Sequence, residues 1–272
     1  MTSDQQAQLD QLLDKYSDIF ASKLTELERT NITKHTIDTR DAMPVKQHSY
    51  RASIPDQEFI RDEIGRMLEA GIIQRSNSPW ASPVVIALKK NGKKRFCVDY
   101  RKVNSITTKD AYPLPQIDQM MDSLGNAKWF SSMDLTSGYW QINMDQNSKA
   151  KTAFVSREGL FEFNVMPFGL CNAPVTFQKT MDIVLGEYNW KFAMVYIDDI
   201  NTYSEIFDEH LQHLQLIFEK IKAAGLKLNK EKCSFVRKTL PFLGHIISDK
   251  GITPDPSTIQ KIQDFPQPRN VS

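Results

Sequence analysis

The sequence predicts an α+β fold built around a split βαβ sheet that carries acidic residues on one face. Two short apolar runs end in aspartate, one at Asp134 and the other at Asp198 and Asp199. Segments with helical spacing of apolar residues lie between and after these runs, so the order is strand, strand pair, helix, hairpin, helix. This order is the connectivity of a split βαβ unit, in which the three acids converge.

The chain has 272 residues, so we expect two or three subdomains. Its apolar content of 40% and charged content of 25% are ordinary for a globular protein, and a net charge of +1 means that any nucleic-acid site is a local patch. No apolar run has the roughly 18 residues of a membrane span, and the N-terminus lacks the pattern of a signal peptide. Cys97, Cys171 and Cys233 form no C-x-x-C pair, which indicates reduced core thiols and no zinc site.

Two helices are expected in the first quarter of the chain. Apolar residues at helical spacing over 7–20 form one stripe, which we interpret as a helix packed on the body. Residues 30–55 alternate and include Pro44 and Pro55, which indicates an extended connector. A second helix follows over 59–68, and Gly71 is its expected end.

Residues 82–100 have the pattern of a β-hairpin, because Asn91-Gly92 is a strong hairpin-turn signal between two strand-like runs. Basic residues surround this turn: Lys89, Lys90, Lys93, Lys94, Arg95, Arg101 and Lys102. Alone, such a tip is best interpreted as a solvated edge that blocks aggregation. Beside a metal–carboxylate site the balance reverses, because these cations could hold the triphosphate of a nucleotide.

A short helix opened by Pro113-Leu114-Pro115 is expected to lead into the strand that ends at Asp134. The turn after this strand contains Gly138, which permits a ligand to approach the backbone closely. Tyr139 follows it and could pack a ring under the sugar of a bound nucleotide, where the ring would exclude a 2′-hydroxyl. The alternative is a tyrosine of the core.

Strands over 151–155 and 160–165 are expected next, joined by a turn that contains Glu158-Gly159. A loop rich in breakers follows over 166–174, and Ala173-Pro174 starts a helix. The apolar face of that helix comprises Phe177, Met181, Val184 and Leu185.

After the Asp-Asp run, an amphipathic helix is expected over 205–224. Its histidines, His210 and His213, are one turn apart, and we interpret them as part of a solvated face rather than a metal site. A strand or hairpin arm over 239–248 and a short helix that stops at Phe265-Pro266 complete the pattern.

The acidic residues are the candidate site. A buried strand has no ordinary use for two adjacent acids, and adjacent carboxylates repel each other unless a cation neutralises them. Asp198-Asp199 is therefore either a metal site or a wet turn, and Asp134 at the end of another strand favours the metal site. Oxygen ligands suit Mg²⁺, and two such ions about 3.5–4 Å apart would stabilise both the attacking and the leaving oxygen of a phosphoryl transfer.

Eight stretches match one known family in a consistent order from about residue 35 to the C-terminus. They are SPWASPVV (78–85), RFCVDYR (95–101), DAYPLP (110–115), DLTSGY (134–139), KTAF (151–154), MPFGLCNAPVTF (166–177), YIDD (196–199) and FLGH (242–245). On these residues the chain resembles the reverse transcriptase of gypsy-type LTR retrotransposons and, more distantly, that of retroviruses. The resemblance covers all but the N-terminal segment.

The resemblance implies a right-hand polymerase with most of the thumb absent. The implied parts are an N-terminal helical segment (1–34), fingers (35–108 and 142–172), a palm (109–141 and 173–250) and the start of a thumb or connection (251–272). It also implies site residues. Asp134, Asp198 and Asp199, with Leu135 beside them, would bind two Mg²⁺ ions, for which Mn²⁺ is an alternative.

Further roles follow from the same resemblance. Lys90 and Arg95 would hold the triphosphate, and the backbone around Ser137 and Gly138 would contact the nucleotide beside Tyr139. Phe168 would line the nucleotide pocket; it is aromatic as in gypsy-type enzymes, where retroviral ones carry glutamine. Contacts with primer and template are implied for Pro167, Gly169, Tyr196, Leu243 and Gly244.

The implied activity is RNA-directed DNA polymerisation, in which deoxynucleotides are added to a primer 3′-hydroxyl and retroelement RNA is copied into DNA. The implied partners are a primed RNA or DNA template, deoxynucleoside triphosphates, and the thumb, connection and RNase H segments of a longer polyprotein, with no membrane. The implied location is a cytoplasmic retroelement particle, with the nucleus as a second compartment.

Two departures keep alternatives open. The chain stops at 267–272, where the family continues into a thumb, so fewer phosphate contacts would hold the primer–template. Asn201 is polar where relatives generally have an apolar residue, which could loosen the hairpin. One alternative is a catalytically weak or inactive nucleic-acid-binding fragment of a decayed or domesticated retroelement. Another is an RNA-directed RNA polymerase of the same palm type, which Tyr139 disfavours.

Overall fold

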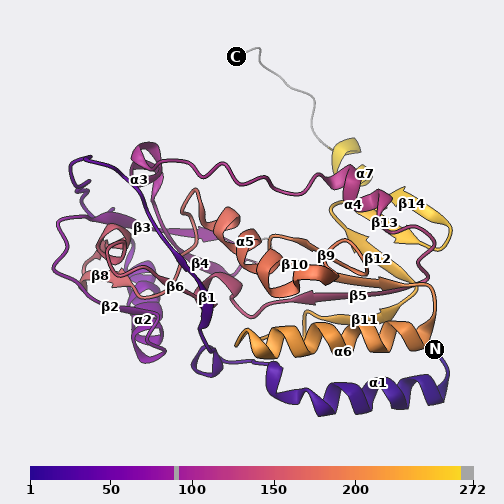
Figure 1. Ribbon diagram of the computed structural model, residues 1–272. Coiled ribbons are helices and arrows are strands. Elements are labelled where there is room, and N and C mark those ends of the chain that lie inside the picture. Colours follow the sequence, from indigo (N-terminus) through magenta and orange to yellow (C-terminus); the bar gives the residue numbers. More distant parts are fainter. Residues whose placement is uncertain (89–91, 265–272) are drawn as a thin grey trace.

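The computed structural model describes residues 1–88 and 92–264, and its centre is a four-stranded antiparallel sheet of order β11-β5-β10-β9 (Figure 1). The strands are β5 (Trp129–Asp134), β9 (Ala193–Tyr196), β10 (Asp199–Ser204) and β11 (Ser234–Arg237). Because β10 is antiparallel to both β5 and β9, those two strands are parallel with one strand between them. This is split βαβ connectivity.

Helices α5 (Ala173–Leu185) and α6 (Phe207–Ala223) pack against this sheet, and α1 (Ser3–Lys15) packs on the outer side of α6 (Figure 1). Helix α6 is amphipathic, and its apolar stripe faces the sheet. The buried apolar residues of α6 are Phe207, Leu214, Ile217, Phe218 and Ile221. Gly225, with φ of +65°, ends the helix in the left-handed conformation that glycine adopts readily.

A five-stranded sheet of order β2-β8-β7-β3-β4 forms the second body of the molecule. Its strands are β2 (Ile73–Arg75), β3 (Ser82–Leu88), β4 (Lys94–Val98), β7 (Phe154–Ser156) and β8 (Gly159–Phe163). Helices α2 (Ile54–Glu69) and α3 (Arg101–Ile106) flank it, and the parallel pair β1 (Thr30–His35) and β6 (Ile142–Met144) lies toward the central sheet (Figure 1). The rings of Phe96, Phe161 and Phe163 pack around Phe154 in its core.

A three-stranded sheet lies at the C-terminal end, beside α4 (Ile117–Asp122) and α7 (Pro256–Gln263) (Figure 1). It comprises β12 (Thr239–Phe242), β13 (His245–Ser248) and β14 (Gly251–Pro254). A second hydrophobic cluster, separate from the main core, joins it to the central sheet. Its members are Met120, Met121, Leu124, Ala127, Phe130, Met194, Tyr203, Leu240, Phe242 and Ile247.

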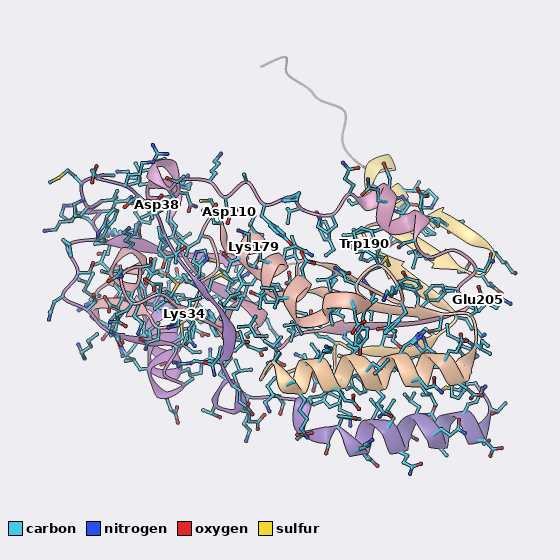
Figure 2. All side chains as sticks on the ribbon, in the orientation of Figure 1. Lys34, Asp38, Asp110, Lys179, Trp190 and Glu205 are labelled. Carbon is cyan, nitrogen blue, oxygen red and sulfur yellow. The ribbon has the colours of Figure 1, made fainter. Side chains whose placement is uncertain are left out.

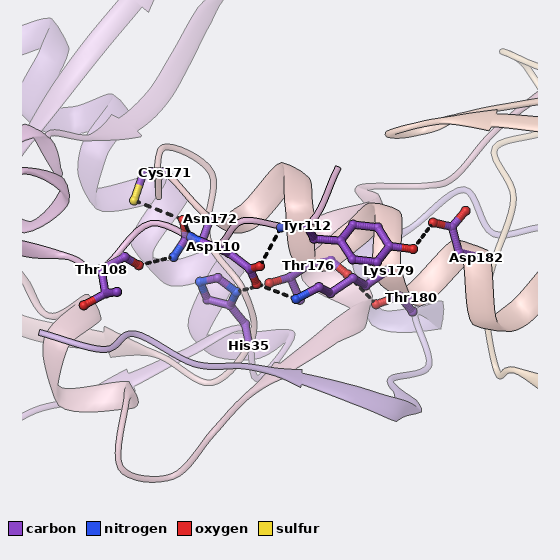
Figure 3. Close-up of polar contacts among 10 residues, drawn as sticks. All are labelled: His35, Thr108, Asp110, Tyr112, Cys171, Asn172, Thr176, Lys179, Thr180 and Asp182. Atoms are coloured by element: carbon purple, nitrogen blue, oxygen red, sulfur yellow. Dashed lines mark hydrogen bonds and ion pairs between the residues drawn. The ribbon is translucent and has the colours of Figure 1, made fainter. Parts of the chain in front are cut away.

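The segment between α3 and α4 crosses the surface of α5 and is tied to it by polar contacts (Figure 3). Lys179 Nζ lies 2.5 Å from Asp110 Oδ2, and the Tyr112 hydroxyl donates to Asp182 Oδ2 at 2.5 Å. In the view of the whole molecule, the Asp110–Lys179 pair lies midway between its two ends (Figure 2). These contacts hold the connecting segment to the helix that supports the central sheet.

Most expected elements form where the hydrophobic pattern indicates them. The helix expected over 7–20 is α1, which begins earlier because Thr2 and Gln5 form a capping box. It ends at Lys15, and a 3₁₀ turn over Ser17–Ile19 follows in place of the last helical residues expected. The expected hairpin is β3 paired with β4, and its turn residues 89–91 lie outside the described residues, as does the expected helix end at Phe265-Pro266. Among the helices described, none is long and apolar enough to cross a membrane.

Two expectations are wrong. The strand expected over 151–155 begins only at Phe154, because Lys149–Thr152 form a 3₁₀ turn in which Thr152 Oγ1 donates to the Lys149 carbonyl at 2.6 Å. His210 does not lie on a solvated face and is fully buried. Its Nε2 lies 2.7 Å from Ser131 Oγ, and its Nδ1 lies 3.0 Å from Ser204 Oγ. Burial lowers the pKa of His210 to about 3, so the ring is neutral.

Asn201 lies in the middle of β10 and is only 1% exposed. Neither its amide oxygen nor its amide nitrogen has a hydrogen-bond partner among the described residues. Tyr203, a member of the second hydrophobic cluster, is two residues further along the strand. Residues two positions apart in a strand point to the same face, so the Asn201 side chain lies on the face of that cluster. A buried polar group without a partner costs about 1–3 kcal/mol, so Asn201 destabilises the hairpin that carries it.

Asn201→Leu should stabilise the protein, because it removes the unpaired amide and keeps the branched shape of the side chain while adding apolar contact. A gain of about 1–2 kcal/mol corresponds to a Tm increase of about 2–6 °C for a chain of this size. Scanning calorimetry measures the change. The matched control, Asn201→Asp, buries a charge at the same position and should lower Tm, whereas an unchanged or lower Tm for Asn201→Leu would contradict the explanation.

Candidate active site

Three aspartates meet at one end of the central sheet. Asp134 is the last residue of β5 and Asp199 is the first residue of β10, and the two are directly paired in the antiparallel ladder. Asp198 lies in the turn that joins β9 to β10. The chain reverses at Ile197, whose φ is +55°. Each apolar strand therefore delivers its acid to the same edge.

The carboxyls of Asp198 and Asp199 are in an unfavourable electrostatic environment. Partial loss of hydration is the main cause that raises the pKa of both groups. Repulsion adds to it, since Asp134 acts on both carboxyls and Asp198 acts on Asp199, while Lys232 opposes the effect. Both acids therefore lose their charge more readily than ordinary aspartates as the pH falls.

Lys232 supplies positive charge at this end of the sheet. Its Nζ lies 3.0 Å from Oδ1 and 3.1 Å from Oδ2 of Asp134, so one ammonium contacts both oxygens. The pair is partly exposed, with 60% of the Lys232 side chain and 26% of the Asp134 side chain accessible, and such pairs contribute little to stability. Its significance is the charge that it brings to the carboxylates.

Gln178 on α5 fixes the turn that carries Asp198. Its side chain is fully buried, and its Oε1 accepts a hydrogen bond from the Ile197 backbone N–H at 2.9 Å. Its Nε2 donates to the Val195 carbonyl at 3.2 Å and to Asp182 Oδ1 at 3.1 Å. The left-handed conformation of a residue with a Cβ costs roughly 1–2 kcal/mol, and the bond from Gln178 helps to hold it at Ile197.

Three residues expected at a nucleotide site form one stack. The rings of Tyr139 and Phe168 are 4.9 Å apart with an interplanar angle of 20°, and the Arg95 guanidinium lies over the Phe168 ring at 5.1 Å. Burial raises the pKa of Tyr139, and the Asp198 carboxylate adds to this effect. The stack therefore lies beside the acids. Lys90, expected in the same site, lies outside the described residues.

Gly138 meets a packing requirement. A Cβ at this position would lie 2.9 Å from the Phe177 ring and 3.3 Å from Leu135 Cβ, so a side chain would collide with the core. Packing against α5 therefore requires glycine here, and the close approach of a ligand to its backbone stays a prediction. Ser137 before it has φ of +48°, and the Leu135 side chain is buried in the main core, which leaves only its backbone to face a ligand.

The expected primer and template residues lie in two places. Pro167 is buried and Gly169 is exposed, on either side of Phe168. Tyr196 and Leu243 both pack against the second hydrophobic cluster, and Gly244 follows Leu243 in the turn between β12 and β13. The structure thus brings the acids and the aromatic stack together. It groups Tyr196 with Leu243 on the second cluster, and Tyr196 is also paired with Asp199 across β9 and β10.

A divalent cation fits this donor set chemically. The candidate ligands are carboxylate and backbone carbonyl oxygens, which Mg²⁺ and Mn²⁺ prefer. A cation would offset the loss of hydration and the repulsion that together raise the pKa of Asp198 and Asp199. Within residues 1–88 and 92–264, no group of three or more histidine, cysteine, aspartate or glutamate side chains is already arranged to hold a metal ion. Asp134 instead contacts Lys232.

The chain belongs to the reverse transcriptase (RNA-dependent DNA polymerase) family, whose model matches residues 87–247. Within it, the chain is a reverse transcriptase domain related to gypsy-family LTR retrotransposon Pol polyproteins. It is 38% identical over 262 residues to the retrovirus-related Pol polyprotein from transposon 297 of Drosophila melanogaster, which covers 94% of this chain and 25% of that protein. It is 39% identical over 268 residues to the polyprotein from transposon opus of the same organism, and this match covers 97% of this chain and 27% of that protein. The chain spans about a quarter of the length of these relatives.

The fold is similar to that of a solved retroviral enzyme. The foamy viral protease-reverse transcriptase in complex with an RNA/DNA hybrid superposes with a TM-score of 0.89 at 26% sequence identity, covering 99% of this chain and 36% of that chain. The mixed α+β architecture is therefore that of reverse transcriptases over nearly the whole chain.

Sequence reasoning missed Lys232 and Gln178. Lys232 lies in a loop without periodicity, so no local pattern marks it. Gln178 offered a weak signal, because it lies three residues before Met181 on the apolar stripe of α5, where a polar side chain requires a buried partner.

Asp198→Asn should raise the Tm of the metal-free protein by about 1–3 °C, because it removes one of the repelling carboxylates. Mg²⁺ should raise the Tm of the wild type, and this increase should be much smaller in the variant, because a candidate metal ligand has been removed. Thermal unfolding in EDTA and in Mg²⁺ measures both changes. Asp249→Asn, at an exposed position in the β13–β14 turn, is the control. A lower metal-free Tm for Asp198→Asn would show that repulsion between the carboxylates does not limit the stability of this site.

Proposed function

We propose that this chain is the fingers-and-palm part of an RNA-directed DNA polymerase that copies retroelement RNA into DNA. The observation that carries the proposal is that Asp134, Asp198 and Asp199 reach one end of the sheet beside the stack of Tyr139 and Phe168. In this proposal the central sheet with α5 and α6 is the palm, and the five-stranded sheet is the fingers. The setting is an intracellular retroelement particle.

Two Mg²⁺ ions held by the three aspartates would lower the pKa of the primer 3′-hydroxyl and stabilise the pyrophosphate leaving group. The chain's own residues position the reactants. The Tyr139 ring is 8% exposed and packs against Phe168 and Phe177, which would hold it rigidly where the sugar of the nucleotide binds. Arg95, together with Lys90 in the proposal, neutralises charge on the triphosphate.

The nucleic acid would extend from the second hydrophobic cluster to the five-stranded sheet. A cavity of 470 Å³ in that sheet is lined by residues that include Tyr50, Arg51 and Arg157. The lining also includes Asp56 and Glu158. The aromatic ring, the two arginines and the apolar floor suit a single-stranded template, which is recognised by its backbone and by stacking. Tyr196 and Leu243, which share the second cluster, would hold the primer 3′ end.

A nucleic-acid-binding module without turnover is the second candidate. The observation that favours it is the unpaired, buried amide of Asn201 in the hairpin that carries Asp198 and Asp199, because a destabilised hairpin holds its acids less rigidly. RNA-directed RNA polymerisation is disfavoured by Tyr139, whose stacked ring would collide with a 2′-hydroxyl.

Primer extension tests the function. The 272-residue chain, with a primed RNA template, deoxynucleotides and Mg²⁺, should extend the primer, and Asp198→Asn should reduce the rate by about a thousandfold or more because a metal ligand of the reaction is lost. Binding of the primed template by wild type and variant is measured in parallel. Binding without extension by the wild type would refute the polymerase proposal and support the binding module.

Tyr139→Val should relax the choice of sugar, because it removes the ring that would exclude a 2′-hydroxyl. The ratio of ribonucleotide to deoxynucleotide incorporation should rise by about tenfold or more, which is roughly 1.4 kcal/mol of discrimination. Tyr139→Phe keeps the ring and is the matched control, with selectivity near that of the wild type. If Tyr139→Val retained full selectivity, the ring would not be the discriminating group.

A further inference from the structure

Gln141 is a buried polar residue at the end of the 3₁₀ turn Gly138–Gln141, and the proposed chemistry gives it no role. Its amide makes three hydrogen bonds, all to the backbone. Nε2 donates to the carbonyls of Thr136 and Lys227, both at 2.9 Å, and Oε1 accepts from the Lys227 N–H at 2.7 Å. One side chain therefore ties the turn after Asp134, which also carries Tyr139, to the segment after α6.

That segment runs along the end of β5 and delivers Lys232 to Asp134. The Thr136 N–H donates to the Lys227 carbonyl at 3.0 Å, and the Asn229 N–H donates to the Asp134 carbonyl at 2.8 Å. Asn229 then closes a turn, in which its Oδ1 accepts from the Lys232 N–H at 3.3 Å. At the end of this turn the Lys232 ammonium contacts both carboxylate oxygens of Asp134. Gln141 is therefore connected to that carboxylate through these hydrogen bonds and the short stretch of chain from Lys227 to Lys232.

We propose that Gln141 is a positioning residue that holds the Lys232 loop in register with Asp134 and with the turn bearing Tyr139. The expected effect of Gln141 on nucleotide incorporation rests on the proposed function, whereas its effect on the position of Lys232 does not. The position requires an amide of this length. Glutamate would turn a carboxylate toward two carbonyl oxygens, methionine would leave these groups without their partner, and asparagine is one methylene shorter.

The opposite side of the same loop is held by the N-terminal segment, and this provides a control. The Leu228 N–H donates to the Ile19 carbonyl at 2.8 Å, and the Ala21 N–H donates to the Leu228 carbonyl at 3.0 Å. Lys227 Nζ pairs with Glu28 at 2.7 Å. Glu28→Gln breaks this ion pair and leaves the bonds from Gln141 in place, because those use the Lys227 backbone.

A double-mutant cycle on Mn²⁺ affinity, measured by electron paramagnetic resonance on the full chain, tests the proposal without requiring turnover. Lys232→Met should tighten Mn²⁺ binding about three- to tenfold, because the ammonium competes with a cation for Asp134. Gln141→Met should tighten it about two- to fivefold when Lys232 is present and have almost no effect when Lys232 is replaced, since coupled residues are non-additive. Glu28→Gln should leave the affinity unchanged.

Single-nucleotide incorporation gives the second readout. Gln141→Met should change kcat by about tenfold with a smaller change in KM, and should change it no further in Lys232→Met, because both substitutions act through the same ammonium beside the carboxylates. Gln141→Asn, which retains an amide, replaces the methionine variant if that variant does not fold.

Equal effects of Gln141→Met with and without Lys232, or unchanged Mn²⁺ affinity in a folded Gln141 variant, would overturn the positioning role. If the wild type extends no primer while the Mn²⁺ cycle shows the expected coupling, the polymerase proposal fails and the positioning role stands.

Discussion

Repulsion among carboxylates at the ends of two neighbouring strands is the constraint on which the rest of the structure depends. Asp134 and Asp199 are directly paired across β5 and β10, and Asp198 adjoins them in the turn. Like charges opposite each other destabilise a sheet. Partial loss of hydration is the main cause that raises the pKa of Asp198 and Asp199, and the repulsion adds to it. Such an arrangement persists only where surrounding structure imposes it, and it creates a place where a cation is strongly favoured.

Two buried glutamine amides and one lysine hold the three carboxylates in this arrangement. Gln178 holds the turn that presents Asp198, and Gln141 links the turn after Asp134 to the loop of Lys232. Each amide lies at 0% exposure and bonds mainly to backbone, so each fixes chain geometry instead of contributing charge. Lys232 is then the one of these three groups that changes the electrostatics, by facing Asp134 with a full positive charge. Rigid amides within a packed core position the groups at the surface.

Much of the fold could be predicted from local patterns, because an element that buries one face has apolar residues at regular spacing in the sequence. The stripe of α6, the hairpin of β3 and β4 and the aspartates that end β5 and begin β10 are all detectable within a few residues of sequence. The roles of Arg95 and Phe168 came from the family resemblance, and the structure adds that their side chains stack with Tyr139.

What local patterns missed depends on contacts between distant segments. The buried state of His210 relies on Ser131, 79 residues away, and no feature of the helix itself indicates that partner. Lys232 reaches Asp134 across 98 residues, and Gln141 reaches Lys227 across 86. The only local sign of such long-range polar contacts is a polar residue among the apolar residues of a buried face, as at Gln178 and Asn201. The partner is decided by tertiary packing.

The most direct test of the central claim is a Mn²⁺ titration of the wild type and of Asp134→Asn, Asp198→Asn and Asp199→Asn, followed by electron paramagnetic resonance. If the three carboxylates act as one site, each substitution weakens Mn²⁺ binding, and the wild type near saturation gives the spectrum of neighbouring, spin-coupled ions. Mn²⁺ bound only as isolated ions, with an affinity that is unaffected by any one of the three substitutions, would contradict a shared site.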